Sequence, residues 1–348
     1  MGVSLEDVAR RAKVSTATVS RVLNDVGLVK PATRARVVKA VRELNYHPNL
    51  HARTLAGGKS RAIGMVVSNI ENPFFLDIFR ALEAEAYSNG YEVLVANTDY
   101  RPQRLAACVH LLMGRRPAGL ALVVSEMDHS LLRELEESEL PTVIYDVGLT
   151  KPNITNIRVN YANGMQRIVA HLHDLGHQRM AFVGHHTSLG PLGYRKRSFL
   201  DTISGFAPGV EFTTVTDVDG PPGGRNAVRR LLATGFAPTA ILCVNDFMAL
   251  GALRELLDHG FNVPGDVSVT GFDDIRLAEY ACPSLTTAHV PREEIGSLIF
   301  ETLIPGEGAA PKLGREIVID PKLIVRESSG PCAGRAQART VAVPDTKP

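Results

Sequence analysis

Apolar side chains in the first sixty residues recur at helical spacing in three short runs. In the first run they stand at i, i+3, i+4 and i+7, as Leu5, Val8, Ala9 and Ala12. Ser4 precedes this run and Asp7 follows three residues later, which is the pattern of an N-terminal helix cap. The spacing therefore predicts a helix over residues 5–12.

Two further helices follow from the same spacing. After a break at Lys13-Val14, the second begins at the capping residue Ser15 and turns Val19, Val22 and Leu23 to one side. The third begins at Pro31, a residue that suits a first helical turn. Its predicted apolar face is Val37, Val38, Val41 and Leu44. Together the runs predict a small three-helix unit.

The outer face of the second helix carries small polar side chains and one arginine: Thr16, Ala17, Ser20 and Arg21. Small residues let a helix enter the major groove closely, and an arginine can bond a guanine edge through two donors. The alternative from spacing alone is a helical bundle without a nucleic-acid partner.

Beyond residue 60 the pattern changes to short apolar runs that alternate with amphipathic stretches. Eight runs are strand candidates, at residues 62–68, 91–97, 119–125, 141–146, 156–160, 179–184, 240–246 and 267–273. Continuous β-branched runs separated by helices are typical of parallel strands buried on both faces. The pattern predicts an α/β fold with two doubly wound subdomains. Residues 331–348 lack periodicity, and we expect a disordered tail there.

Charge is distributed unevenly between these two parts. Residues 1–60 hold 11 lysines and arginines against 4 acidic residues, a net charge of +7, whereas the remainder holds 27 against 33, a net charge of −6. A basic end on an acidic body is typical of a polyanion-binding head, although a solvated basic face is the plainer reading of charge alone.

Composition narrows the class of protein further. No apolar run approaches the length of a membrane helix, and the N-terminus lacks the pattern of a secretion signal. The four cysteines, Cys108, Cys243, Cys282 and Cys332, have no metal-site spacing. We find no phosphate-binding, nucleophile-elbow or zinc-protease motif. The sequence thus predicts a cytoplasmic protein that is not an enzyme and needs no cofactor or metal.

The headpiece motifs resemble those of the lactose-repressor (LacI/GalR) family of transcriptional regulators. The segments that carry the resemblance are SLEDVARRAKVSTATVSRVLN (4–24), PATRARVVKAVRELNYHPN (31–49) and HARTLAGGKS (51–60). The resemblance continues to about Ser328. It implies a homodimeric repressor that binds a pseudo-palindromic operator in double-stranded DNA and responds to a small-molecule effector, a sugar or sugar derivative. A sugar-transport receptor and a regulator with a protein co-repressor are the rival readings.

The resemblance also implies a domain organisation. It places a helix-turn-helix headpiece at 1–46, a hinge helix and linker at 47–60, and an effector-binding and dimerisation domain at 61–330. Within that domain the N-subdomain takes 61–158 and 290–320, and the C-subdomain takes 159–289 and 321–330. The chain would cross between them near residues 158–160, 289–292 and 320–322.

DNA contacts follow from the same alignment of motifs. Thr16, Ala17 and Arg21 stand where the family reads bases. The positions near phosphates are Ser4, Leu5, Ser15, Thr18, Ser20, Asn24 and Thr33. Phosphate contacts set position and salt-dependent affinity, whereas base contacts select the sequence.

The hinge residues implied by the resemblance are Asn49, Ala52, Arg53 and Leu55. Leu55 aligns with a leucine that wedges into a base step, where an apolar side chain unstacks the bases and bends the duplex. Ala52 would allow two hinges to approach closely, and Arg53 would meet phosphates. A linker leucine packed on its own domain is the alternative for Leu55.

Effector contacts are expected where parallel strands end at their carboxyl edge. The resemblance and the strand ends together give Phe74, Phe75, Asp146, Arg195, Asp246 and Phe272. Aromatic rings that stack on a sugar, with carboxylates and an arginine for its hydroxyls, form such a site. Phe75 could equally belong to the core. For Asp273-Asp274 turn hydrogen bonds are favoured over a role in the site, and for His185-His186 a surface loop is favoured over contact with the ligand.

Overall fold

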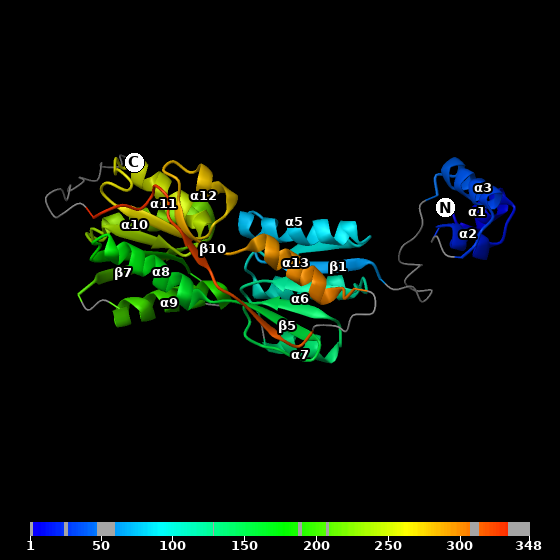
Figure 1. Cartoon of the computed structure of the whole chain (residues 1–348), viewed down its shortest axis with the longest axis horizontal. Helices are drawn as coiled ribbons and strands as arrows, with labels where there is room; N and C mark the ends of the chain where they lie inside the picture. Colours follow the sequence, from blue (N-terminus) through cyan, green and yellow to red (C-terminus); the bar gives the residue numbers. More distant parts are fainter. Residues whose placement is uncertain are drawn as a thin grey trace. The chain divides into compact units, whose positions relative to one another are not determined.

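The structure is a computed structural model, and it describes residues 3–23, 27–46, 60–127, 129–186, 190–206, 209–306 and 313–332. The chain divides into two compact units, residues 1–60 and residues 61–348 (Figure 1). We refer to these units as the headpiece and the body and describe each by itself.

The described part of the headpiece contains three helices around a small apolar core. They are α1 (Leu5–Ala12), α2 (Thr16–Leu23) and α3 (Pro31–Glu43). The predicted cap of α1 is present, since Ser4 Oγ accepts from the Asp7 amide and Asp7 Oδ2 accepts from the Ser4 amide at 2.9 Å. Buried side chains from all three helices form the core: Val8, Ala9, Ala12, Val19, Val22, Val37 and Ala40.

The inner face of α3 differs from the predicted one. Val38 is 38% exposed, whereas Ala40 is buried at 2%. A helix turns once in 3.6 residues, so Val37, Ala40, Val41 and Leu44 share one stripe and Val38 lies outside it. The prediction of Val38 as a core residue was wrong because it counted every valine of an apolar run.

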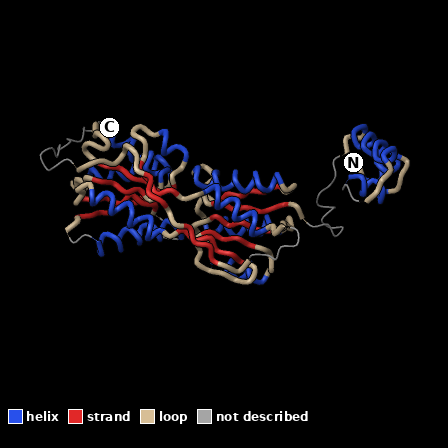
Figure 2. The backbone as a smooth tube through the Cα atoms, in the orientation of Figure 1, coloured by secondary structure: helices blue, strands red, loops and turns tan. Residues whose placement is uncertain are grey.

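The body contains two six-stranded sheets, drawn in red in Figure 2. The first has the order β11-β5-β4-β3-β1-β2 and the second β12-β10-β9-β8-β6-β7. The first sheet comprises β1 (Ala62–Val67), β2 (Glu92–Asn97), β3 (Gly119–Val123), β4 (Thr142–Tyr145), β5 (Ile154–Val159) and β11 (Glu316–Ile319). The second comprises β6 (Arg179–His185), β7 (Glu211–Asp217), β8 (Ala240–Cys243), β9 (Ser268–Asp273), β10 (Thr286–His289) and β12 (Lys322–Ile324). Pairing is parallel except between β10 and β12, which confirms the α/β fold class.

Helices cover both faces of each sheet (Figure 1). Those of the first sheet are α5 (Pro73–Ser88), α6 (Pro102–Met113), α7 (His129–Glu137) and α13 (Arg292–Leu303). Those of the second are α8 (Tyr161–Asp174), α9 (Gly190–Phe206), α10 (Gly220–Ala233), α11 (Asp246–Asp258) and α12 (Arg276–Tyr280). Alternate strand residues serve opposite faces: Met65 packs with the core shared by α5 and α13, and Val66 with the core under α6 and α7.

We call the first sheet with its helices the N-subdomain and the second with its helices the C-subdomain. The chain passes between them from β5 to α8, from β10 to α13 and from β11 to β12. Strand β8 ends at Cys243, three residues before the end of the predicted run, and Asn245 caps α11. Asp246 is therefore the first residue of a helix, and its prediction as the last residue of a strand was wrong.

Strands β7, β10, β11 and β12 were not among the predicted runs. β7 is an edge strand whose residues are exposed or half-buried, and β10 is the short sequence Thr-Thr-Ala-His. A strand of this kind needs no continuous apolar run, so periodicity alone does not find it.

Helices α10 and α11 pack closely because glycines face backbone across their contact. A Cβ on Gly224 would lie 2.0 Å from the Met248 carbonyl oxygen, and one on Gly251 would lie 2.0 Å from that of Pro221. This approach brings the N-termini of both helices toward the same end of the sheet, next to the carboxyl end of β8.

We expect Gly251→Ala to destabilise the body by ~1–3 kcal/mol or more, because the added methyl group has no space without a backbone shift. Urea unfolding followed by circular dichroism would measure this as a lower midpoint. Gly205→Ala in α9 is the matched control, since its Cβ would meet nothing within 4 Å and alanine favours a helix by ~1 kcal/mol. Equal midpoints for the Gly251→Ala variant and the wild type would contradict the close packing.

Candidate functional site

A cavity lies between the two subdomains at the carboxyl ends of their strands. From the N-subdomain it is lined by Asn72, Phe74, Phe75, Tyr100, Val124, Ser125 and Tyr145. From the C-subdomain it is lined by Pro191, Leu192, Arg195, Asn245 and Asp273. The walls combine aromatic rings with a few polar groups, which is the composition of small-molecule sites.

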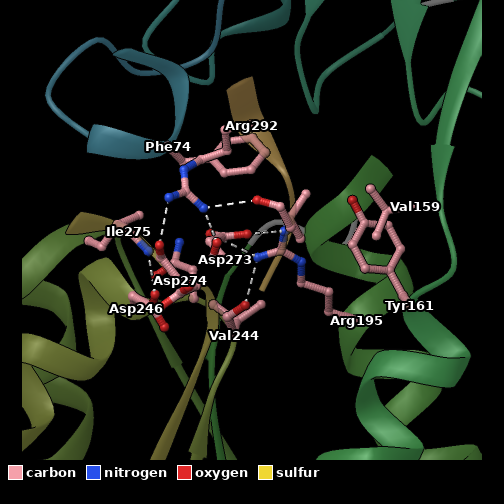
Figure 3. A network of polar contacts seen from close by, with 12 residues as sticks. Phe74, Val159, Tyr161, Arg195, Val244, Asp246, Asp273, Asp274, Ile275 and Arg292 are labelled. Carbon is pink, nitrogen blue, oxygen red and sulfur yellow. Dashed lines mark hydrogen bonds and ion pairs between the residues drawn. The ribbon is translucent and has the colours of Figure 1, made fainter. Parts of the chain in front are cut away.

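Arg195 of α9 is the central cation of this cavity. Its side chain is buried, and its terminal nitrogens donate to Asp273 Oδ1 at 2.6 Å and to the Val244 carbonyl at 2.8 Å (Figure 3). The guanidinium carbon lies 4.4 Å from the ring centre of Phe272 and 5.0 Å from that of Tyr161. Among the described residues, Arg195 Nε has no hydrogen-bond partner.

Asp273 forms the other half of a buried ion pair. Burial raises its pKa and the Arg195 charge opposes that shift. The pKa of Arg195 is raised: its burial acts to lower it, and the Asp273 charge more than offsets this. Each charge therefore needs the other, and removing one would leave the second buried without compensation. The assignment of Asp273 to turn hydrogen bonds missed this role. The side chain of Asp274 also bonds outside the turn, accepting from Arg326 at 2.7 Å.

Three of the six predicted effector residues line the cavity. Phe74 and Phe75 form an edge-to-face pair at the start of α5 with ring centres 5.3 Å apart, and both also belong to the core. Arg195 is the third. Phe272 does not line the cavity, because its buried ring lies under Arg195 instead.

Asp246 does not reach the cavity. Its carboxylate is fully buried at the start of α11, where Oδ1 accepts from the Thr287 hydroxyl at 2.5 Å and Oδ2 from the Ile275 amide at 2.8 Å. Burial raises its pKa well above the usual range. The expected projection of this carboxylate toward a ligand is corrected: the neighbouring Asn245 lines the cavity, and Asp246 joins the ends of β9 and β10.

Asp146 also lies behind the cavity wall. Oδ1 accepts from the Val159 amide at 2.8 Å, and Oδ2 accepts from the Tyr161 hydroxyl at 2.5 Å. Its carboxylate thus ties the end of β4 to the crossing from β5 to α8. Burial raises the pKa of Asp146 to about 7, against the opposing effect of the hydrogen bonds from Tyr161 and Val159. Tyr145, one residue earlier, reaches the cavity instead.

Tyr100 lines the cavity but was not among the predicted site residues, and the ring of His185 packs beside it. Tyr100 follows β2 and donates its hydroxyl to Asp219 at 2.8 Å, and its ring lies 5.0 Å from that of His185. His185 is the last residue of β6 and only 6% exposed, so its prediction as a surface-loop residue was wrong. Burial lowers the pKa of His185 to about 4. The position of His185 at the end of a strand, and of Tyr100 three residues beyond one, is the signal that could have found them.

The predicted base-reading side chains share one exposed face of α2. Thr16, Ala17 and Arg21 are exposed, whereas Val19 and Val22 on the opposite face are buried. Ser15 caps the helix by accepting from the Thr18 amide at 3.2 Å. The other predicted contact positions are exposed or half-buried: Ser4, Leu5, Thr18, Ser20 and Thr33. Asn24, Asn49, Ala52, Arg53 and Leu55 lie outside the described residues, as does 333–348 of the predicted tail.

The described part of the chain contains neither a membrane-spanning helix nor a cluster of metal-binding side chains. None of its helices is long and apolar enough to cross a membrane. Within the same residues there is no group of three or more histidine, cysteine or acidic side chains placed to hold a metal ion.

The headpiece and the body each match a known protein family. Residues 4–49 match the model of bacterial regulatory proteins of the lacI family, and residues 169–329 match a periplasmic binding protein-like domain. The chain is 32% identical over 329 residues to the HTH-type transcriptional repressor PurR of Edwardsiella ictaluri, covering 93% of this chain and 96% of that protein.

Solved structures of transcriptional regulators are similar to this chain over nearly its whole length. A Lac repressor dimer bound to operator and the anti-inducer ONPF has a TM-score of 0.80 at 28% identity, covering 95% of this chain and all of that one. A complex of the transcriptional regulator CelR with cellobiose has a TM-score of 0.63 at 27% identity, covering 94% of this chain and all of that one.

The raised pKa of Asp146 predicts a pH-dependent stability that Asp146→Asn removes. The folded state holds a proton on Asp146 that the unfolded chain releases near pH 3.8, so this stabilisation is complete below about pH 4 and is lost as pH rises to about 7. Asparagine does not titrate. We therefore expect the stability of the variant relative to the wild type to improve between pH 5 and pH 8, by roughly 3 kcal/mol. Urea unfolding of both proteins at the two pH values would measure it; a constant difference would refute the assignment.

Proposed function

The chain belongs to the lacI family of bacterial regulatory proteins, and from that premise we propose that it is a homodimeric repressor whose operator affinity is controlled by a sugar or sugar derivative. Membership makes it a DNA-binding transcriptional repressor with an effector-binding body. The proposal adds three points to this: the residues that contact DNA, the dimer, and the chemical class of the effector.

The exposed face of α2 supports its role as the recognition helix. Val19 and Val22 anchor the helix in the headpiece core, so Thr16, Ala17 and Arg21 face solvent on a rigid support. Arg21 can donate two hydrogen bonds to a guanine edge in the major groove, while the small side chains let the helix approach. The net charge of +7 on residues 1–60 supplies the attraction to phosphates.

A dimer follows from the way such headpieces read DNA. Each helix-turn-helix contacts one half-site, so a pseudo-palindromic operator needs two copies related by a two-fold axis. The similar Lac repressor structure is a dimer bound to operator, which supports the same assembly for this chain. We propose that Leu55, Ala52 and Arg53 serve the hinge between headpiece and body in each copy, with Asn49 beside them.

The cavity between the subdomains is the observation that carries the effector proposal. Aromatic rings from Phe74, Phe75 and Tyr145 give it flat apolar walls, and Arg195 with Asp273 supplies a donor and an acceptor. This pairing suits the alternating C–H faces and hydroxyls of a sugar. The CelR structure, similar over nearly the whole chain, holds cellobiose.

Arg21→Ala tests the recognition helix. With an operator found by selection from random duplexes, we expect the variant to bind it about five- to a hundredfold more weakly, since a bidentate base contact is worth ~1–3 kcal/mol. Binding to random DNA should fall much less. Fluorescence anisotropy at several salt concentrations would measure both.

Arg36→Ala is the control for charge. Arg36 is exposed on α3 and outside the predicted contact set, so its replacement removes the same charge from the headpiece. It should weaken binding to operator and to random DNA alike. A loss of the same size and kind for both variants would mean that Arg21 contacts phosphate and reads no base.

A thermal-shift screen tests the effector class. A ligand that binds only the folded state raises the apparent midpoint, so we expect a rise with one or more sugars, ribose and cellobiose among them. Ser125→Ala should weaken that ligand about two- to tenfold, the loss of one hydrogen bond of ~0.5–1.5 kcal/mol, because Ser125 lines the cavity. Ser204→Ala, on the exposed face of α9, is its control. Stabilisation by nucleobases and by no sugar would contradict the proposed class.

A further inference from the structure

One carboxylate in the cleft collects hydrogen bonds from both subdomains. Asp219 Oδ2 accepts from Tyr100 Oη at 2.8 Å, Asn72 Nδ2 at 3.2 Å and Asn69 Nδ2 at 3.3 Å, all in the N-subdomain. Its Oδ1 accepts from Asn245 Nδ2 of the C-subdomain at 2.9 Å. Three of these four donors belong to residues that line the cavity.

Asp219 stands where an aspartate would normally cap its own helix. It is the N-cap residue of α10, where an aspartate usually accepts from the first amides of its own helix, yet here its side chain makes no such bond. The carboxylate instead faces the donors of the other subdomain. A side chain that leaves its own helix uncapped gains its stabilisation from the groups that it contacts across the cleft.

The two asparagines are held in one orientation by bonds at both ends. Asn72 Oδ1 accepts from the Phe74 amide and caps α5, and Asn245 Oδ1 accepts from the Met248 amide and caps α11. Each Nδ2 then points toward Asp219. Two helix caps on opposite sides of the cleft thus share one acceptor, and the backbone geometry at both helix starts depends on it.

The same carboxylate fixes the direction in which the Tyr100 hydroxyl donates its hydrogen bond. Because its hydroxyl proton goes to Asp219, its oxygen can only accept from a ligand in the cavity. No ion pair of Asp219 exists among the described residues, so its acceptors are matched by neutral donors alone.

We propose that Asp219 is a positioning residue of the effector cleft: it orients Asn72, Tyr100 and Asn245 as one array and holds the two subdomains together across the cavity. The role for the effector rests on the proposed function, but the array itself needs no ligand. Loss of the carboxylate frees both helix caps and separates the cleft walls.

Hydrogen–deuterium exchange of the full chain, without effector or DNA, tests the array directly. In Asp219→Asn one acceptor oxygen becomes an NH2 donor, so in either orientation of the amide a donor faces Asn245 or faces Tyr100 and Asn72. We expect amides in residues 69–75 and 245–249 to exchange roughly tenfold faster, the factor that corresponds to about 1.4 kcal/mol. Both sides of the cleft should change together.

Asp217→Asn is the matched control. Asp217 lies two residues earlier and pairs with Arg230 inside the C-subdomain at 2.9 Å, so its variant should leave residues 69–75 at the wild-type rate. Tyr100→Phe removes a single donor from the other side and should raise exchange in the same two segments to a smaller extent. It serves as the test if Asp219→Asn does not fold.

Two results would overturn the proposal. Wild-type exchange at 69–75 in both Asp219→Asn and Tyr100→Phe would show that the bonds across the cleft do not form in solution. Faster exchange confined to residues 219–233 would show that Asp219 serves its own helix alone. Neither result depends on a sugar, so failure of the effector proposal would leave this test intact.

Discussion

The cleft depends on the three crossings of the chain between the two sheets. At the second crossing Arg292 links the subdomains: it pairs with Asp77 of α5 at 3.1 Å and donates to the carbonyls of Val290, Asp273 and Asp274. Figure 3 shows this guanidinium above the end of β9. A buried cation that donates to one carboxylate and three carbonyls holds its surroundings in one geometry, because any partner that moves away leaves a charge without compensation. The edge that carries Asp273 is thereby placed opposite α5.

Carboxylates around the cleft are stabilised in three different ways. Asp273 is balanced by the Arg195 charge, and Asp246 and Asp146 accept from amides and hydroxyls in places where burial raises the pKa. Asp219, half-buried, accepts from neutral side chains that come from both subdomains. Only the last arrangement can be opened to solvent at modest cost, because its donors and acceptors can all bond to water instead. The rigid carboxylates therefore build each wall, and the exchangeable one joins the walls.

The apolar pattern of the sequence predicted the architecture. It placed two cavity side chains one residue too late, choosing Asp246 where Asn245 lines the cavity and Asp146 where Tyr145 does. Apolar runs identified the buried strands β1, β3, β4 and β9, since a strand covered on both faces must be continuously apolar. Side-chain direction at a strand end depends on where the strand stops, and β8 stops before Asn245. The carboxylate of Asp246 therefore turns into the C-subdomain, and the less conspicuous Asn245 faces the cavity. The sequence pattern did not predict the role of Asp219, because three of its four partners come from segments more than a hundred residues away.

A cleft that responds to an effector needs two states of similar free energy. A ligand can shift the equilibrium only by the difference between its affinities for the two states. Many strong bonds across the cavity would hold it in the closed state. If there were no bonds across it, the two walls would not be aligned for binding. Four bonds to one carboxylate, each worth little net of its hydration, lie between these limits. Because Asn72 and Asn245 also begin α5 and α11, a change at this carboxylate reaches the first turn of a long helix in each subdomain. The carboxylate that joins the cavity walls is thus bonded to the N-cap residue of one long helix in each subdomain.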